Sequence, residues 1–259
     1  MKTVILAGGL GTRLREETEF RPKPLVEIGG RPILWHIMQS YIGYGHNDFA
    51  ILVGYKGEQI KRYFTDFRLL NSNVVIDSRK DFIPEYAGSN EIIDWRVEII
   101  DTGQLTQTGG RLFNARDRLL GDRFFCTYGD GVSDVNISNL LSFHKSHGKI
   151  ATVTVVQPMS RFGVMRRNSE GLVTEFLEKP QMEGIASAGF FVFEPEIFDY
   201  LGPNATLERE PLASLAANNQ LMSFQHNGFW EPMDTFRETQ QLNEMWERGD
   251  RPWIVTKGD

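Results

Sequence analysis

Cysteine is almost absent from this sequence: Cys126 is the single one among 259 residues. One cysteine excludes an internal disulfide and a cysteine-based zinc site, and its place in the apolar run 124–127 indicates a buried small side chain rather than a nucleophile. Long apolar runs are missing as well. The hydrophobic start at residues 1–6 is too short for a signal peptide or a membrane span. We therefore expect a cytoplasmic protein that does not enter a membrane.

An excess of positive charge is also lacking. The 28 Lys and Arg residues are outnumbered by 34 Asp and Glu residues, and the formal net charge is -6 at pH 7. Such a balance gives no overall attraction to nucleic acid or to anionic membranes, so neither is an expected partner. Any site for an anionic ligand has to be built locally, against the field of the whole chain.

Short apolar runs alternate with segments of helical period through the first part of the chain. The runs, taken as strands, cover residues 3–6, 49–53, 74–76, 97–100, 124–128 and 150–156. Between them apolar residues recur at helical spacing, as Ile33, Ile37 and Tyr41 do behind Pro32. Strands that are apolar along their whole length and separated by helices indicate a mainly parallel sheet covered on both faces. The sequence therefore predicts a doubly wound α/β fold, in a single domain over residues 1–259.

Two segments interrupt this alternation. Residues 79–96 have no clear period and contain Pro84 and Gly88, which predicts a long loop. Residues 162–193 have antiparallel character, with a hairpin followed by another strand, and we expect them to extend the main sheet. The tail at 234–246 returns to helical spacing.

The strongest local motif is the glycine-rich turn Leu6-Ala7-Gly8-Gly9-Leu10-Gly11-Thr12-Arg13-Leu14, directly after the first strand. Ligands of open α/β sheets bind at the carboxyl ends of strands, and glycines let backbone N–H groups approach a phosphate. Leu14 takes the place of the last glycine of a dinucleotide-binding fingerprint, and a P-loop would need Lys-Ser/Thr after Gly11. A plain glycine turn is the alternative, but three glycines followed by Thr-Arg at this position disfavour it. The turn predicts a phosphate site of another kind.

A lysine with restricted backbone follows in Arg21-Pro22-Lys23-Pro24. The two prolines limit the conformations of the residues around them, so Lys23 is suited to present a point charge to a phosphate. Alone, it would be interpreted as a solvated lysine in an exposed loop. Together with Arg13, ten residues earlier, it predicts an electrostatic clamp.

Further motifs continue nearly to the end of the chain. They are Val26-Glu27-Ile28-Gly29-Gly30, Gly54-Tyr55-Lys56-Gly57, Asp101-Thr102-Gly103, Thr108-Gly109-Gly110-Arg111-Leu112, Tyr128-Gly129-Asp130-Gly131, Arg161-Phe162-Gly163, Glu178-Lys179-Pro180 and Pro232-Met233-Asp234-Thr235. With the glycine-rich turn and Lys23-Pro24, they make the chain resemble the sugar-1-phosphate nucleotidylyltransferase family, and within it the glucose-1-phosphate cytidylyltransferases.

The resemblance implies a Rossmann-like fold and a defined reaction. A cytidylyl group passes from CTP to glucose 1-phosphate, or to a close sugar 1-phosphate, and pyrophosphate is released. The attacking phosphate oxygen is already anionic, so positioning and charge stabilisation suffice and no general base is needed. UTP or dTTP as the donor and a different phosphorylated acceptor remain alternatives. A catalytically silent nucleotide-sugar sensor is a further alternative, although a sensor has no need of the full set of five charges: Arg13, Lys23, Asp130, Lys179 and Asp234.

The same resemblance assigns residues to the two substrates. The nucleotide is assigned to Leu6, Ala7, Gly8, Gly9, Gly11, Thr12, Arg13, Lys23, Thr108 and Gly109. The sugar phosphate is assigned to Tyr128, Glu178, Lys179 and Ser187, and catalysis to Arg13, Lys23 and Lys179. Arg111 is expected to start the next helix or to support the phosphates. Relatives carry Asn-Gly-Gly where this chain has Ser187-Ala188-Gly189, and a hydroxyl lacks the paired donor and acceptor of an amide, so the acceptor sugar could differ.

Two aspartates are candidates for metal binding. Asp130 lies between Gly129 and Gly131 just after an apolar run, and Asp234 lies just before the last helix. Taken singly they would be an Asp-Gly turn and a helix N-cap. Triphosphate chemistry in a chain of net negative charge calls for a divalent cation, and Mg²⁺ prefers carboxylate oxygens. The resemblance implies that the pair binds Mg²⁺, and that the chain forms a homo-oligomer, for which the aromatic-rich residues 82–95 are a candidate contact surface.

Overall fold

The computed structural model describes residues 1–87, 94–160 and 162–255. A seven-stranded sheet forms its centre, in the order β14-β10-β13-β8-β1-β4-β7. Its strands are β1 (Thr3–Ala7), β4 (Asp48–Val53), β7 (Arg96–Asp101), β8 (Phe124–Tyr128), β10 (Ala151–Val156), β13 (Ala186–Phe193) and β14 (Leu221–Gln225). Every pair of neighbours is parallel except for β13, which runs antiparallel to both β8 and β10. The predicted α/β class with a mainly parallel sheet is confirmed.

Two hydrophobic clusters cover the two faces of the sheet, because successive residues of a strand point to opposite sides. In β1, Ile5 belongs to one cluster, and Val4 and Leu6 belong to the other. The first cluster includes residues of four helices: α2 (Ile33–Gly43), α3 (Gly57–Thr65), α6 (Ile137–His147) and α8 (Phe236–Arg248). The second includes residues of α5 (Thr108–Asn114) and α7 (Glu210–Ala217). The sheet is therefore doubly wound, as the apolar strands indicate.

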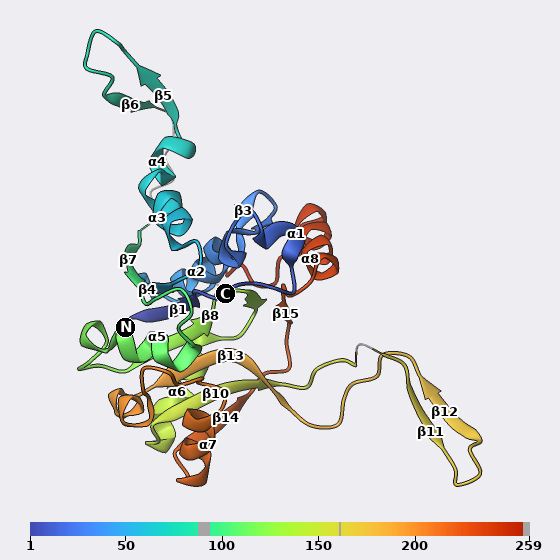
Figure 1. Ribbon diagram of the computed structural model, residues 1–259. Helices are drawn as coiled ribbons and strands as arrows, with labels where there is room; N and C mark the ends of the chain where they lie inside the picture. The colour runs from blue at the N-terminus through green and yellow to red at the C-terminus, as the bar shows by residue number, and fades with distance from the viewer. Residues whose placement is uncertain (88–93, 161, 256–259) are drawn as a thin grey trace.

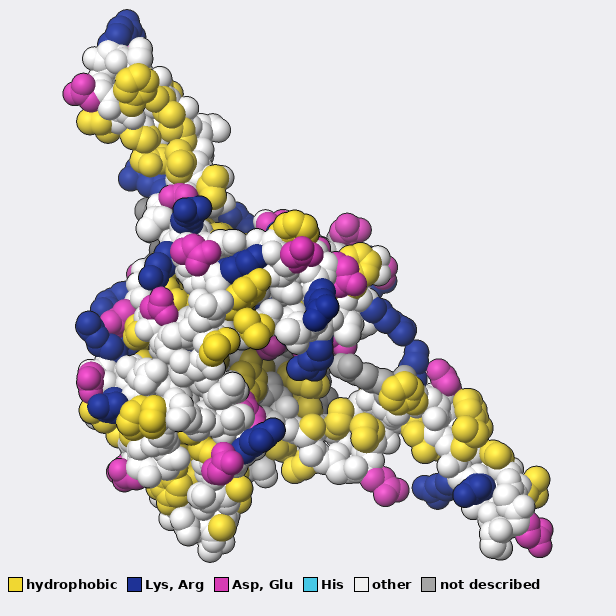
Figure 2. All heavy atoms as spheres, in the orientation of Figure 1, with side chains coloured by type: hydrophobic (Ala, Val, Ile, Leu, Met, Phe, Trp, Pro, Cys, Tyr) yellow, Lys and Arg dark blue, Asp and Glu magenta, His cyan; other side chains and the backbone are white. Residues whose placement is uncertain are grey.

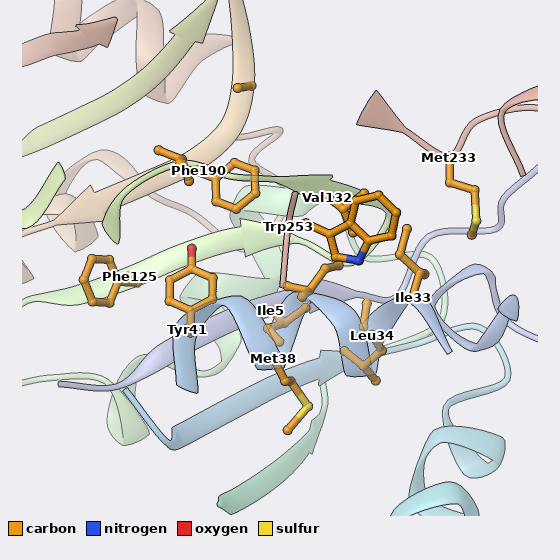
Figure 3. Close-up of a cluster of buried hydrophobic side chains, with 14 of the residues drawn as sticks. Ile5, Ile33, Leu34, Met38, Tyr41, Phe125, Val132, Phe190, Met233 and Trp253 are labelled. Carbon is orange, nitrogen blue, oxygen red and sulfur yellow. The ribbon is translucent and has the colours of Figure 1, made fainter. Parts of the chain in front are cut away.

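Large aromatic side chains pack among aliphatic ones in the first cluster, part of which is shown in Figure 3. Tyr41 of α2 lies against Phe125 and Phe190, with ring centroids 5.4 and 6.4 Å away. Trp253, in the C-terminal segment, is fully buried and donates through Nε1 to His36 Nδ1 at 3.2 Å. Full burial of one such side chain contributes about 1.5–3 kcal/mol, so this cluster anchors both α2 and the chain end.

The final helix has clear signals at both ends. Thr235 caps it by accepting from the backbone N–H of Glu238, whose side chain accepts in return from the backbone of Thr235. Gly249 ends it with φ of 81°, a left-handed conformation that glycine adopts without strain. These caps place Asp234 immediately before the helix and outside its capping position.

Two hairpin arms extend away from the body at opposite ends of the molecule (Figure 1). One pairs β5 (Asn73–Ile76) with β6 (Pro84–Ala87), beyond α4 (Phe67–Leu70), and the other pairs β11 (Val164–Arg167) with β12 (Val173–Leu177). The hairpin expected within 162–193 thus exists, but it forms its own two-stranded sheet, and only β13 joins the main one. The expected strand at 74–76 likewise pairs with β6 alone.

The long loop expected at 79–96 is wrong in part. Residues 84–87 form β6, and 96 begins β7, whereas 88–93 lie outside the described residues, as does Arg161 of the Arg161-Phe162-Gly163 motif. The short elements are α1 (Arg15–Thr18), β2 (Glu27–Ile28), β3 (Arg31–Pro32), β9 (Gly131–Ser133), β15 (Trp230–Pro232) and three 3₁₀ turns, at Lys23–Leu25, Arg116–Arg118 and Pro195–Tyr200. Within the described ranges, no helix has the length and apolar character needed to cross a membrane. The single domain over 1–259 stays a prediction.

Candidate active site

The glycine-rich turn lies at the carboxyl end of β1 and is held from two sides. A Cβ atom on Gly8 would lie 2.1 Å from the guanidinium carbon of Arg111, so only glycine leaves room for that side chain. Gly11 has φ of 64°, and its carbonyl accepts a hydrogen bond from Thr18 Oγ1 at 3.0 Å. The turn therefore keeps one shape, with its backbone facing a cavity.

Arg111 is the residue that holds this turn. Its side chain is almost completely buried and donates to the carbonyl oxygens of Gly8, Val53 and Gly103, at 2.8, 3.0 and 2.8 Å, and to Thr102 Oγ1 at 2.8 Å. Burial lowers the pKa of Arg111 below its ordinary value. The expectation that Arg111 starts the next helix is wrong, because α5 begins at Thr108. The hydrogen bonds of its guanidinium group named above all go to protein acceptors. Its role here is to join α5 to the carboxyl ends of β1, β4 and β7.

A cavity of about 620 Å³ opens next to the turn, a size suited to a small ligand such as a nucleotide. Of the residues assigned to the nucleotide, all except Gly109 line it. Gly109 is buried against the segment that precedes α7, where a Cβ would lie 2.9 Å from the carbonyl oxygen of Ala205. Its place in the motif reflects close packing of two backbones.

Four charged side chains meet at the mouth of this cavity. Lys23 Nζ donates to Asp130 Oδ2 and to Asp234 Oδ1, both at 2.6 Å, and Arg13 Nη1 donates to Asp234 Oδ2 at 2.6 Å. Lys23 is only 8% exposed and Asp234 only 9%, whereas the Arg13 side chain is 72% exposed. Lys23 is thus a buried link between the two aspartates, and Arg13 is an exposed charge at the surface.

The two aspartates come from separate ends of the fold. Asp130 follows β8, and its carbonyl accepts from the backbone N–H of Met233, which brings the two carboxylates to one place. The Asp234 backbone N–H donates to Glu238 Oε2 at 2.6 Å, and the Asp234 carboxylate faces Lys23 and Arg13. Among the described residues, no group of three or more His, Cys, Asp or Glu side chains is arranged to hold a metal ion. Two carboxylates fit a hard divalent cation that completes its shell with phosphate oxygens and water.

A second cavity of about 440 Å³ adjoins the first, and the two share Arg13, Tyr128 and Asp130. Ser187 lines the second cavity, with Oγ accepting from the Gly189 backbone N–H at 3.2 Å. Gly189 has φ of 80°, and a Cβ there would lie 2.4 Å from the Tyr128 ring. Of the residues assigned to the sugar phosphate, the structure brings Tyr128 and Ser187 to this cavity.

Glu178 and Lys179 do not line either of these cavities. They lie at the base of the β11–β12 arm, with Lys179 Nζ 4.0 Å from Glu178 Oε1. Lys179 lines a separate cavity of about 650 Å³, together with residues around Trp230 and the start of α8. Lys179 also has φ of 46° directly before Pro180, an uncommon conformation for a residue in that position.

One residue of the second cavity was missed in the sequence. Glu208 accepts hydrogen bonds from Thr108 Oγ1, at 2.7 Å, and from the hydroxyl of Tyr128. It lies in an irregular segment before α7, where neither spacing nor a motif points to it. Its partners are 100 and 80 residues away, so no local signal in the sequence could have identified it.

Comparison with known proteins agrees with this architecture. The family model described as nucleotidyl transferase matches residues 2–236. The chain is 46% identical over 256 residues to a glucose-1-phosphate cytidylyltransferase of Salmonella typhimurium, and the match covers 98% of each chain. It is 42% identical over 257 residues to a probable glucose-1-phosphate cytidylyltransferase of Bacillus subtilis, and this match covers 98% of this chain and all of that one. The crystal structure of HddC from Yersinia pseudotuberculosis shares the fold, with a TM-score of 0.68 at 21% identity over 95% of this chain and 99% of that one. The chain belongs to the nucleotidyl transferase family.

Proposed function

We propose that this enzyme transfers the cytidylyl group of CTP to α-D-glucose 1-phosphate and releases pyrophosphate. The observation that carries the proposal is the pair of adjoining cavities with Arg13, Lys23, Asp130 and Asp234 at their boundary. Two anionic substrates entering from the two cavities would meet at these four charges. The identity to the two cytidylyltransferases, over nearly the whole chain, supports the choice of substrates.

The first cavity holds the nucleotide, with its phosphates along the backbone of the glycine-rich turn. Arg13 and Lys23 neutralise charge that develops on the departing pyrophosphate, and each contributes about 3 kcal/mol, or about 100-fold in rate. The acceptor phosphate attacks the α-phosphorus in line, and its own charge makes a general base unnecessary. The chain thus acts by positioning and by electrostatic stabilisation.

The second cavity holds the sugar, next to Tyr128 and Ser187. Lys179 and Glu178 act on the acceptor only if the base of the β11–β12 arm approaches this cavity, because Lys179 now lines a neighbouring one. Ser187 already uses its hydroxyl as an acceptor for the Gly189 backbone N–H, which leaves it less to offer a sugar hydroxyl. The acceptor therefore needs a direct test.

Asp130 and Asp234 are proposed to hold Mg²⁺. When bound, the ion would supply positive charge to the reacting phosphates. With the ion balancing the charge of the two carboxylates, the ammonium group of Lys23 would be available to the phosphate oxygens. Activity that persists in excess EDTA without added divalent cation contradicts this part of the proposal.

The decisive experiment measures pyrophosphate release with four triphosphates and a panel of sugar 1-phosphates. We expect CTP with glucose 1-phosphate and Mg²⁺ to give the highest kcat/KM. A higher value with UTP or dTTP, or with another sugar phosphate, would replace the corresponding substrate. Nucleotide binding without pyrophosphate release for any pair would indicate a sensor and contradict the enzymatic proposal.

A homo-oligomer is proposed from the two arms. Figure 2 shows hydrophobic side chains along both arms, and those of the second include Met165, Leu172, Val173 and Phe176, which are 51–66% exposed. A two-stranded hairpin is marginally stable by itself in water, so each arm needs a surface to cover it. Light scattering should give a mass above 29.6 kDa, and Phe176→Ser should lower it. The cytoplasmic location stays a prediction.

A further inference from the structure

The segment that carries Glu208 is fixed against the start of α5. The Gly110 backbone N–H donates to the carbonyl oxygen of Ala205 at 2.9 Å, and the Leu207 N–H donates to Thr108 Oγ1 at 2.9 Å. A Cβ on Gly110 would lie 2.3 Å from the carbonyl oxygen of Pro203, so the two backbones meet closely only because glycine is present. This packing holds Glu208 where the two cavities join.

Glu208 determines the direction of two hydrogen bonds. A carboxylate has no proton to give, so the hydroxyls of Thr108 and Tyr128 both donate to it. Burial, and then the negative charge of Glu208, raises the pKa of Tyr128, so its phenol keeps the proton that it donates. Thr108 Oγ1 also accepts from Leu207, which leaves it one lone pair and no proton for a ligand. Toward the first cavity, which Thr108 lines, this hydroxyl can only accept.

We propose that Glu208 sets the choice of nucleotide, by fixing the hydroxyl of Thr108 as an acceptor for the exocyclic amine of cytosine. The inference rests on the proposed function and deepens it. Uracil and thymine have a carbonyl oxygen at the place of that amine. Two acceptors that face each other repel and leave a polar group without a partner, which weakens binding of those two nucleotides. The fixed hydroxyl thus favours CTP over UTP and dTTP.

The test compares the kcat/KM ratio of CTP to UTP in the full-length enzyme and in two variants. In Glu208→Gln the amide can donate to Thr108, so the hydroxyl regains a proton for the uracil oxygen, and we expect the ratio to fall about 10-fold. Thr108→Val removes the acceptor with little change in shape and should lower the ratio similarly. Glu210→Gln, an exposed change two residues away with the same loss of charge, is the matched control and should keep the wild-type ratio.

Calorimetric titration with CTP and with UTP separates this inference from the proposed function. If the wild type releases no pyrophosphate, the proposed function fails, and the ratio of the two dissociation constants, in wild type and both variants, still decides the inference. A ratio that is unchanged in both Glu208→Gln and Thr108→Val overturns it. So does an equal loss for CTP and UTP in Glu208→Gln, since that is the result of a purely structural role. A ratio that falls in both variants and not in the control supports it.

Discussion

Replacing Lys23 with methionine tests whether the ammonium group holds the two aspartates together. Lys23 lies 2.6 Å from both Asp130 and Asp234, and the methionine would leave two carboxylates facing each other without that charge. Removal of one partner from a buried ion pair costs about 3–5 kcal/mol. The Asp130 side chain is 36% exposed, so water compensates for part of this, and we expect a loss near the lower end, about 3 kcal/mol.

Arg13→Met is the matched comparison. Arg13 also contacts Asp234 at 2.6 Å, but its side chain is 72% exposed, and such a surface pair contributes about 0.5 kcal/mol. We expect both variants to lose about 100-fold in kcat/KM, while only Lys23→Met unfolds at a clearly lower urea concentration. All unfolding curves are recorded in excess EDTA, so that no divalent cation replaces the ammonium group. Equal unfolding midpoints for the two variants would refute the linking role of Lys23.

Three other perturbations test the surroundings of the site. Burial lowers the pKa of His36 from 6.5 to about 4, so the unfolded chain binds the proton first, and stability present above pH 6.5 is lost as the pH falls toward 4, by about 3 kcal/mol. Between pH 7 and pH 4.5 the free energy of unfolding, measured with urea, should fall more in wild type than in His36→Gln. Equal decreases would show that His36 is not the source of this pH dependence. Arg111→Met leaves the carbonyl of Gly8 and its neighbours without their donor, so stability should fall by about 2 kcal/mol or more, and the KM for CTP should rise. An unchanged KM would mean that the turn keeps its shape without Arg111. Gly189→Ala forces a methyl group against the Tyr128 ring at φ of 80°. We expect about 1–3 kcal/mol of destabilisation in urea unfolding, and a higher KM for glucose 1-phosphate in steady-state kinetics. An unchanged KM for glucose 1-phosphate would show that the Tyr128 ring does not shape the acceptor site.

Local patterns in the sequence were sufficient for much of the architecture. The apolar strands predicted a mainly parallel sheet covered on both faces, and in the structure their alternate residues divide between two clusters. The glycine-rich turn was placed correctly at the end of the first strand, and it lines the first cavity. These inferences succeed because strand burial, helical spacing and glycine turns depend on residues that are close in the chain.

Pairing between distant strands could not be obtained in this way. The runs at 74–76 and 162–177 have strand character, but both form separate arms, because a strand pattern does not specify a partner. The same limit applies to Lys179, whose motif suggested a place beside the sugar although the arm keeps it in another cavity. The motif residue Arg111 is also committed to carbonyl groups that only the folded chain brings near it.

The sequence by itself determined the fold class and the position of the glycine-rich turn after the first strand, and it singled out the charged residues proposed for the site. Only the tertiary structure decided that Lys23 joins two aspartates 107 and 211 residues away, and that Glu208 lies between Thr108 and Tyr128. Sheet order and register set these contacts, and both arise from the packing of the whole chain. No window of the sequence contains that information.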